Sequence, residues 1–305
     1  MVLPPSHLAS RPGRLPPAEL AWVAHVVGNG ATVQKARAMG AATTDLWALD
    51  IRSRGGRHHR TVLRRFTSDR LSGDPWYRPE HEAAVLRMLE RTPVLAPRLL
   101  GANLGPGADP PLLLTTRLGG RPPRRPGSLA VVVDELAREL TVIHGLESPS
   151  LLELPAYEPY YPAAELSPPA WSSRPEIWQA AIHATKALPP SGRRFIHRDY
   201  HQANTLFRRG QLTGVVDWLT ACRGPVAIDL ARMRANLATQ FGPPWPERFL
   251  EAYRRLASWP IDDLRAWELI DCADIVPELR PPGTRADARR WDRLEGHVAA
   301  VAMSG

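Results

Sequence analysis

The first 118 residues contain short runs in which apolar and polar positions alternate, and such runs predict β-strands. The predicted strands cover residues 32–39, 46–51, 60–66, 99–101 and 111–118. Two helices are indicated among them: residues 16–27, with proline at the entry and Gly28 and Gly30 after the end, and residues 80–91, with apolar residues at helical spacing. This part of the chain is therefore predicted to be a sheet with helices packed on it.

Helical spacing dominates after residue 128. The predicted helices cover residues 129–146, 177–188, a stretch that ends at 239, 246–258, 261–276 and 284–303. Residues 119–127 are rich in Gly, Pro and Arg and predict a connector. We therefore expect an α+β protein with a boundary at this connector, which separates residues 1–118 from residues 119–305.

One stretch after residue 128 departs from the helical pattern. Residues 195–207 consist of an apolar pair, a polar loop and a second short apolar run, and residues 214–216 form another apolar run that leads to Asp217. The residues between these two runs, 208–211, predict a turn that pairs one strand with the other. The pattern thus places several polar side chains close together.

Composition narrows the classes of function. The chain has 305 residues, of which 44% are hydrophobic and 23% charged, as is usual for a soluble globular protein. The net charge of +8 comes almost entirely from scattered arginines, since Lys35 and Lys186 are its two lysines, so we expect no nucleic-acid partner. Two cysteines, Cys222 and Cys272, match no disulfide framework or zinc motif.

The sequence also bears on location. Residues 1–19 are broken by five prolines and lack the apolar run of a signal peptide. No later segment has the length of apolar residues that a membrane span requires. We therefore expect a cytoplasmic protein without a membrane partner. The oligomeric state is left open.

The polar residues of the unusual stretch suit phosphoryl transfer. Asp199 and Asn204 share one loop, and Asp217 follows Asn204 by thirteen residues. Phosphoryl transfer needs a carboxylate for the attacking hydroxyl, metal ligands and cations that spread charge. Asp199 is predicted to accept the hydroxyl proton, while Asn204 and Asp217 offer the oxygens that Mg²⁺ prefers.

The same loop permits a different interpretation. His197, Asp199 and His201 stand at alternate positions and could ligate zinc or another transition metal, as in a metallohydrolase. That hypothesis leaves Asn204 and Asp217 without a role. We therefore favour the phosphoryl-transfer interpretation.

The loop resembles the catalytic loop of the aminoglycoside phosphotransferase and choline kinase-like superfamily, relatives of the protein kinases. Residues 197–204 read His-Arg-Asp-Tyr-His-Gln-Ala-Asn, and residues 216–218 resemble the metal-binding segment of these enzymes. The resemblance covers residues 32–240. It implies a protein-kinase-like two-lobed fold, with an antiparallel N-terminal sheet, a mainly helical C-terminal lobe, and ATP or GTP with Mg²⁺ as cofactors. His197 would brace the loop, and His201 would shape it or lie beside the transferred phosphate.

The resemblance also assigns residues upstream of the loop. Arg64 falls where the family has a phosphate-contacting lysine, and Glu82 falls where it has a helix glutamate that pairs with that lysine. Strand alternation puts Arg64 and Arg65 on opposite faces. The hinge that binds the base is predicted at residues 114–118. The remaining nucleotide-binding residues predicted from the resemblance are Gly40, Thr43, Thr115, Thr116 and Leu118.

The acceptor is predicted to be a hydroxyl of a small molecule. An antibiotic is one class, and a primary metabolite such as choline, an amino alcohol or a sugar is another; a catalytically silent binding module is a third hypothesis. An acidic rim would attract a cationic antibiotic, whereas the aromatic residues of 157–178 would wall an apolar one. The carboxylates available for such a rim are Asp262, Asp263, Glu268, Asp271, Asp274 and Glu278.

Overall fold

The computed structural model describes residues 14–28, 30–39, 45–67, 71, 76–105, 107–124, 127–189 and 192–303. They fall into two compact units. The N-terminal unit comprises Leu3–Gly119 together with Gly214–Thr220, and the C-terminal unit comprises Gly120–Thr213 and Ala221–Gly305. The chain therefore returns to the N-terminal unit late in its course.

The N-terminal unit contains the predicted antiparallel sheet. Its strands lie in the order β1 (Thr32–Met39), β2 (Asp45–Arg52), β3 (His58–Arg65), β5 (Leu112–Thr116) and β4 (Leu99–Asn103). The strands predicted from alternation are confirmed, with small differences at their ends. Each pair of neighbours is antiparallel, and Arg64 on β3 stands between Leu46 of β2 and Leu113 of β5.

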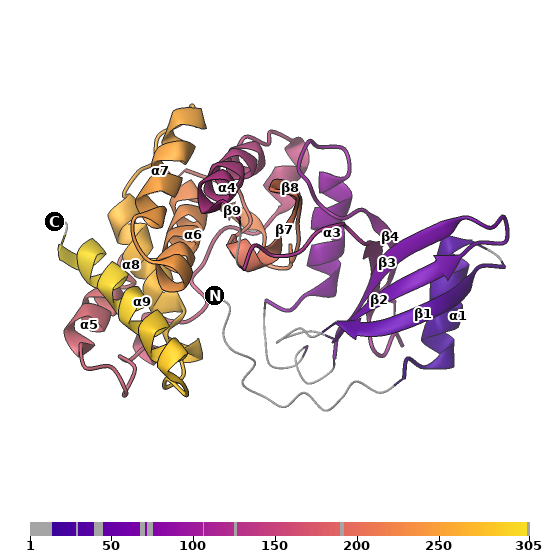
Figure 1. The fold of residues 1–305 in the computed structure, drawn as a ribbon, viewed down its shortest axis with the longest axis horizontal. Helices are drawn as coiled ribbons and strands as arrows, with labels where there is room; N and C mark the ends of the chain where they lie inside the picture. The colour runs from indigo at the N-terminus through magenta and orange to yellow at the C-terminus, as the bar shows by residue number, and fades with distance from the viewer. Residues whose placement is uncertain are drawn as a thin grey trace. The chain divides into compact units, whose positions relative to one another are not determined.

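Two helices pack on this sheet, α1 (Pro17–Val27) and α3 (Pro79–Leu89) (Figure 1). Apolar side chains alternate between two core clusters along β5. Leu112 and Leu114 pack in the cluster that contains Val23 of α1, and Leu113 packs in the cluster that contains Ala83 of α3. The alternation of one strand therefore joins both helices to the sheet.

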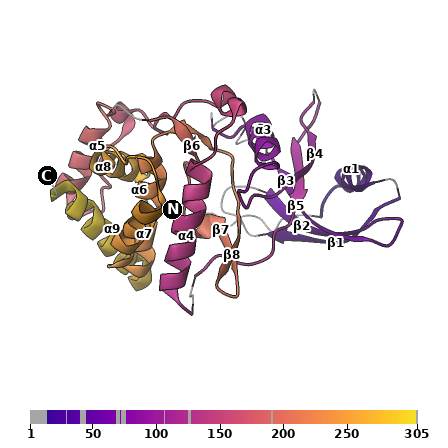
Figure 2. The same cartoon turned by 90° about the horizontal axis from the view of Figure 1, so that it is seen from above.

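The C-terminal unit is mainly helical (Figure 2). Its α-helices are α4 (Leu129–His144), α5 (Pro175–Ala184), α6 (Val226–Phe241), α7 (Trp245–Leu256), α8 (Leu264–Asp274) and α9 (Arg285–Met303). Short 3₁₀-helices occur at η1 (Pro149–Glu153), η2 (Ala163–Glu165), η3 (Gln202–Asn204) and η4 (Val276–Glu278). The helices predicted from apolar spacing are all present. None of the helices among the described residues combines the length and the apolar run that crossing a membrane would take.

Helix α6 is the centre of this unit, because it packs against α7, α8 and α9. Fourteen of its residues are buried, so it has no solvent-facing stripe. Two of these buried residues are arginines, Arg232 and Arg234. A buried arginine requires carboxylate or carbonyl partners, and both of these have carboxylate partners on α8.

Two pairs of short strands follow, of which the last two residues of β8, Gly214 and Val215, already belong to the N-terminal unit. Strand β6 (Arg194–Ile196) pairs with β9 (Cys222–Gly224), and β7 (Thr205–Arg208) pairs with β8 (Gln211–Val215). The predicted turn between β7 and β8 is confirmed. Arg209 and Gly210 both have positive φ, 52° and 83°, as the tightest hairpin turns require.

Candidate active site

The loop that contains Asp199 begins where β6 ends. Strand β6 is held by β9, with Ile196 opposite Cys222. Gly224 of β9 allows this pairing to be close, because a Cβ at this position would come within 2.7 Å of Ile196 and 2.8 Å of Tyr157. The start of the loop is therefore fixed by a strand pair that tolerates no side chain at residue 224.

Asp229, near the start of α6, holds the backbone of the loop. Its Oδ2 accepts the N–H of His197 at 2.8 Å, and its Oδ1 accepts the N–H of Arg198 at 2.7 Å. Arg198 has φ 69°, a left-handed conformation that costs about 1–3 kcal/mol in a residue other than glycine. The two hydrogen bonds to buried Asp229 stabilise this conformation.

A chain of buried polar groups supports Asp229 in turn. His144 of α4 approaches Asp229 Oδ2 with Nε2 at 3.0 Å and Tyr253 Oη with Nδ1 at 2.7 Å. Because a carboxylate oxygen accepts, the imidazole proton lies on Nε2 and Nδ1 accepts the Tyr253 hydroxyl proton, while the Tyr253 oxygen accepts Trp259 Nε1–H at 2.8 Å. Burial lowers the pKa of His144, which therefore stays neutral. His144 is a hydrogen-bonded core histidine.

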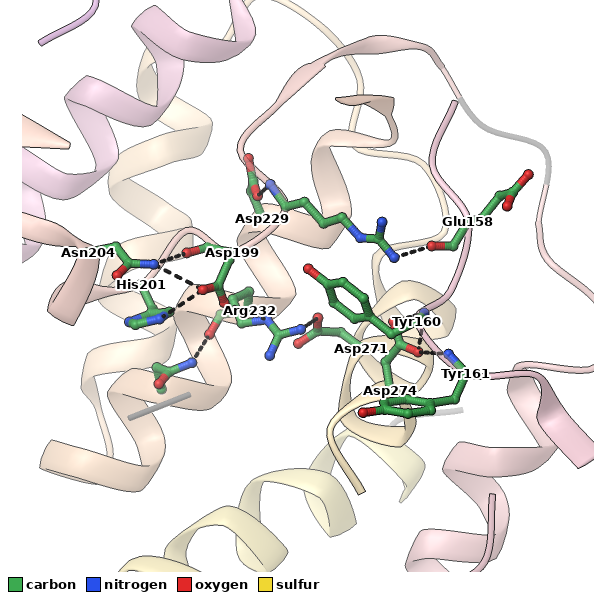
Figure 3. A network of polar contacts seen from close by, with 12 residues as sticks. Glu158, Tyr160, Tyr161, Asp199, His201, Asn204, Asp229, Arg232, Asp271 and Asp274 are labelled. Carbon is green, nitrogen blue, oxygen red and sulfur yellow. Dashed lines mark hydrogen bonds and ion pairs between the residues drawn. The ribbon is translucent and has the colours of Figure 1, made fainter. Parts of the chain in front are cut away.

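Asp199 lies among three donors from two elements (Figure 3). Its Oδ2 accepts Asn204 Nδ2–H at 3.0 Å and lies 3.4 Å from His201 Nε2, while its Oδ1 lies 3.8 Å from Arg232 Nε. The side chain remains 30% exposed. Asp199 thus combines a fixed orientation with access from outside.

The charge state of Asp199 follows from these neighbours. Burial raises the pKa of the Asp199 carboxyl, but His201 and Arg232 among others oppose it, and the pKa lies well below its ordinary value. Asp199 is therefore ionised across the neutral range.

His201 is a neutral donor. Its Nδ1 accepts the N–H of Ala203 at 3.2 Å, which caps η3 and leaves the imidazole proton on Nε2, facing Asp199. Burial, with the positive charge of Arg232 nearby, lowers the pKa of His201 to about 4. The ring of His197 is fully buried and packs edge-on against Tyr200 at 6.0 Å. Of the two loop histidines, His201 is the one that contacts Asp199.

Asn204 is oriented by Asp199. Its Nδ2 donates to the Asp199 backbone carbonyl at 3.1 Å as well as to the carboxylate. The amide oxygen therefore faces away from Asp199, as Figure 3 shows. An amide oxygen held in this way fits the donor set of a hard cation such as Mg²⁺.

A second cluster lies in the N-terminal unit. Arg64 Nη1 contacts Glu82 Oε2 at 2.5 Å, and Arg64 Nη2 contacts Asp217 Oδ1 at 2.8 Å. Burial lowers the pKa of Arg64, but the two carboxylates outweigh it and raise the pKa above its ordinary value. The predicted pairing of Arg64 with Glu82 is confirmed, even though arginine replaces the usual lysine.

The segment Gly214–Thr220 brings Asp217 to this cluster. The N–H of Val215 donates to the Leu95 carbonyl at 2.7 Å, and Leu219 packs against the core cluster that contains Phe66 and Ala83. Gly214 lies so close to Leu118 that a Cβ would come within 2.2 Å of that side chain. Asp217 itself has φ 69°. Its carboxylate is therefore held by packing of the backbone and by Arg64.

Sequence comparison identifies the family. The model of the phosphotransferase enzyme family matches residues 50–270, which is well over half of the chain. The protein belongs to this family. The resemblance inferred from the catalytic loop is thereby confirmed, and a comparison with curated proteins gave no match.

Solved structures show that this phosphotransferase has the protein-kinase-like fold of its relatives. It is 15% identical to a thermostable mutant of aminoglycoside phosphotransferase APH(4)-Ia in complex with ADP and hygromycin B, covering 90% of this chain and 96% of that chain with a TM-score of 0.59. It is 19% identical to macrolide 2′-phosphotransferase MphH from Brachybacterium faecium, covering 94% and 98% with a TM-score of 0.57.

The other predicted nucleotide-binding residues of the phosphotransferase lie at the end of β5. Thr115 Oγ1 lies 3.5 Å from the Val62 carbonyl, and Thr116 Oγ1 accepts the N–H of Arg98 at 2.9 Å. Leu118 is half-buried against Gly214. Gly40 and Thr43 lie outside the described residues. The assignment of these residues to a nucleotide stays a prediction.

The predicted acidic rim is not present in the form expected. Asp271 is buried with Arg232 at 3.0 Å, and the Asp274 carboxylate accepts the N–H groups of Tyr160 and Tyr161 (Figure 3). Glu268 is buried beside Arg234. Helical spacing correctly indicates a shared face for Asp271 and Asp274, but that face points into the protein.

The aromatic residues of 157–178 are largely engaged as well. Arg198 lies over the ring of Tyr160 at 3.7 Å and that of Tyr157 at 5.1 Å, and Trp171 stacks on Trp291 at 5.9 Å. Tyr160 remains half-exposed. These aromatic rings are packed against other side chains of the protein, so they do not form the wall that was expected for an apolar acceptor.

Arg232 is the site residue that sequence analysis missed. It lies in a helix without a polar face, so periodicity gives no sign of its role. A charged residue three positions after Asp229 in an apolar helix was the available signal. The metallohydrolase hypothesis finds no support, because no group of three or more His, Cys, Asp or Glu suited to a metal occurs among the residues that the structure describes.

Proposed function

We propose that this phosphotransferase moves the γ-phosphoryl group of ATP or GTP to a hydroxyl of a small molecule of the antibiotic type, with Mg²⁺, in the cytoplasm, and that it acts there as a resistance enzyme. The observation that carries the proposal is the Asp199 carboxylate, which is ionised, partly exposed and oriented by Asn204 and His201. A carboxylate in that state is what an attacking hydroxyl requires.

Asp199 is a weak base, because its pKa is depressed. It therefore serves chiefly to orient the hydroxyl and to receive its proton late in the reaction. This role suits phosphoryl transfer through a loose transition state, in which the nucleophile needs little activation. His201 and Asn204 hold Oδ2 by donating to it, which directs Oδ1 to the incoming hydroxyl.

Asn204 Oδ1 and the Asp217 carboxylate are the proposed ligands of Mg²⁺. When bound, Mg²⁺ would neutralise charge on the nucleotide phosphates. Asp217 fits this role, since one of its oxygens is paired with Arg64 while the side chain stays 33% exposed. Arg64, held by Glu82, is the proposed cation for the phosphates.

Nucleotide use is supported by relatives of the same fold. APH(4)-Ia has been solved with ADP and hygromycin B and with AMP-PNP and hygromycin B. Thr115, Thr116 and Leu118 of this chain remain the proposed contacts for the base, and Gly40 and Thr43 the proposed contacts for the phosphates.

Charge at the proposed acceptor side favours an antibiotic with few amino groups. Glu268, Asp271 and Asp274 are buried and occupied by Arg234, Arg232 and backbone N–H groups. Three of the six carboxylates that could have attracted a polycation are therefore committed to internal partners.

The test is transfer from γ-labelled ATP or GTP, with and without Mg²⁺, to a panel of macrolides, aminoglycosides, tuberactinomycins, choline, amino alcohols and sugars. Wild-type protein is compared with Asp199→Ala. Transfer confined to primary metabolites would contradict the antibiotic proposal. Nucleotide binding without transfer to any acceptor would instead indicate a silent binding module.

A further inference from the structure

Arg232 joins two carboxylates in the C-terminal unit. Its Nη2 contacts Asp271 Oδ1 on α8 at 3.0 Å, and its Nε lies 3.8 Å from Asp199 Oδ1. Figure 3 shows the three side chains in a row, with the Arg232 side chain between the two acids. The side chain of Arg232 is 5% exposed and that of Asp271 is 3% exposed. The pair is thus buried directly behind the proposed catalytic carboxylate.

One guanidinium faces two carboxylates, so it cannot neutralise both. The pKa of Asp271 is raised to about 7 as the net result of three main causes. Burial raises this pKa, the charge of Arg232 lowers it, and the nearby Asp274 raises it. The pKa of Arg232 is raised by the two acids despite burial, so Arg232 stays charged. Near neutral pH, the charge of Asp271 therefore changes with pH, whereas the charge of Arg232 does not.

Hydrogen bonding around the pair is incomplete. Asp271 Oδ2 and Arg232 Nε are buried and have no hydrogen-bond partner among the described residues. A pair that served only to tie α6 to α8 would gain most from a two-bond contact. Instead, Arg232 contacts Asp271 through Nη2 alone, and its Nε faces Asp199. This geometry divides the guanidinium between the two acids.

We propose that Arg232 and Asp271 are positioning residues for Asp199: Asp271 holds the Arg232 guanidinium, which in turn fixes and balances the charge of the Asp199 carboxylate. The catalytic meaning of this inference rests on the proposed phosphoryl transfer. The charge coupling between Asp271 and Asp199 does not rest on it.

Several other charged and titratable groups near Asp271 have partners or surroundings of their own. Asp274 is bonded to the N–H groups of Tyr160 and Tyr161. Arg198 donates to the Glu158 carbonyl and stacks on Tyr160. Burial raises the pKa of Tyr157 well above its ordinary value, so this phenol stays neutral. Among the described residues, Arg232 is therefore a cation that contacts both Asp271 and Asp199.

The same two helices supply a matched control. Arg234 of α6 pairs with buried Glu268 of α8 and also with Glu247 of α7. The contacts of Asp199 to described residues that are given above go to Asn204, His201 and Arg232, not to this pair. Asp271→Asn and Glu268→Gln each convert a buried carboxylate of α8 to an amide. A purely structural role predicts similar effects of the two changes, whereas a positioning role predicts different ones.

The first measurement is the hydrolysis of Mg·ATP, in which water is the acceptor. The reaction is monitored by the release of phosphate. We expect Asp271→Asn to lower kcat at least about tenfold with KM for ATP changed less than about twofold, because the binding of nucleotide is untouched. Glu268→Gln should keep kcat within about twofold of wild type. Arg232→Lys, which keeps the charge without the planar fork, should retain an intermediate kcat. Equal losses of kcat in Asp271→Asn and Glu268→Gln would overturn the proposal.

The second measurement needs no reaction. The Asp271 carboxyl carbon is titrated by ¹³C NMR in wild type, Asp199→Asn and Glu268→Gln. Removing the negative charge of Asp199 strengthens the effect of Arg232 on Asp271. The midpoint of the Asp271 titration should therefore fall by about half a pH unit or more in Asp199→Asn and stay unchanged in Glu268→Gln. An unchanged midpoint in Asp199→Asn would overturn the coupling even in an active enzyme. A shifted midpoint in a protein that transfers no phosphate would instead refute the proposed function alone.

Discussion

The two units each contain a buried arginine between a buried helix carboxylate and a partly exposed aspartate, yet the two arrangements differ in tightness. In the N-terminal unit, Arg64 contacts Glu82 at 2.5 Å and Asp217 at 2.8 Å. In the C-terminal unit, Arg232 contacts Asp271 at 3.0 Å and Asp199 at 3.8 Å. The exposed aspartates are alike, with 33% of Asp217 and 30% of Asp199 accessible.

This difference matches the proposed roles. A metal ligand has to stay in one place, and Asp217 is fixed by a short charge-assisted hydrogen bond. A carboxylate that receives a hydroxyl needs orientation and also an oxygen that can accept a new partner. The longer contact to Arg232 supplies charge to Asp199 Oδ1 without the short hydrogen bond that Arg64 makes to Asp217.

The largest expected contrast is between the two exposed aspartates. Asp199→Ala should lower phosphoryl transfer by about 10²–10⁴-fold while nucleotide affinity stays near wild type, because its role lies in the transfer step. Asp217→Ala should lower Mg·ATP affinity at least about tenfold, since even groups behind metal ligands have effects of that size. Stopped-flow turnover and calorimetric binding separate the two. Near wild-type turnover in Asp199→Ala would falsify the assignment of this residue.

The next contrast concerns stability after loss of each arginine. Arg64→Met leaves Glu82 and Asp217 without their cation and should lower the free energy of unfolding by about 3–5 kcal/mol. Arg232→Met should have a smaller effect at pH 6, because Asp271, with a pKa of about 7, is already mostly protonated there and leaves less uncompensated charge. Urea unfolding followed by fluorescence measures both. If Arg64→Met and Arg232→Met lower the free energy of unfolding equally at both pH 6 and pH 8.5, the two arginines act alike.

Asp271 should also affect the pH dependence of stability. Its pKa in the folded protein is raised from 3.8 to about 7, so the folded state binds more protons than the unfolded state in this range. Stability from this group is therefore present below pH 4 and is lost as the pH rises to 7. Asp271→Asn should destabilise the protein more at pH 5 than at pH 8, by at least about 1 kcal/mol. Glu268→Gln is the control for the same pair of helices.

The smallest expected effect is that of His201→Asn. The amide oxygen can still accept the N–H of Ala203 and cap η3, but the contact to Asp199 is lost. We expect the free energy of unfolding to change by less than about 1 kcal/mol and kcat to fall severalfold. A kcat equal to wild type would indicate that His201 only shapes the loop.

The pattern of apolar and polar residues over short windows of the sequence predicts much of the fold. Alternation along β3 predicts that Arg64 and Arg65 point to opposite faces, and Arg65 does bind Glu19 and Asp45 while Arg64 binds Glu82. Strand alternation is a property of neighbouring residues, so a short window suffices. The pairing of Arg64 with Asp217, which lies 153 residues further along the chain, was not predicted from the sequence.

Helix α8 shows the limit of the same reasoning. Spacing places Asp271 and Asp274 on one face, but spacing alone does not say whether solvent or α6 lies opposite that face. The answer depends on Arg232 in another helix, which supplies the countercharge that burial requires. Because α6 is buried nearly all round, Arg232 stands out from its pattern only by its charge.

The return of Gly214–Thr220 to the N-terminal unit has a consequence for biosynthesis. When Gly119 leaves the ribosome, the sheet is complete in sequence but Arg64 still lacks Asp217, and the core of α3 still lacks Leu219. At about 5–20 residues per second, the missing segment follows about 5–20 s later. Until then Arg64 has only one of its two carboxylate partners, and the N-terminal unit can reach its final state only after Gly120–Thr213, the first part of the C-terminal unit, has been synthesised.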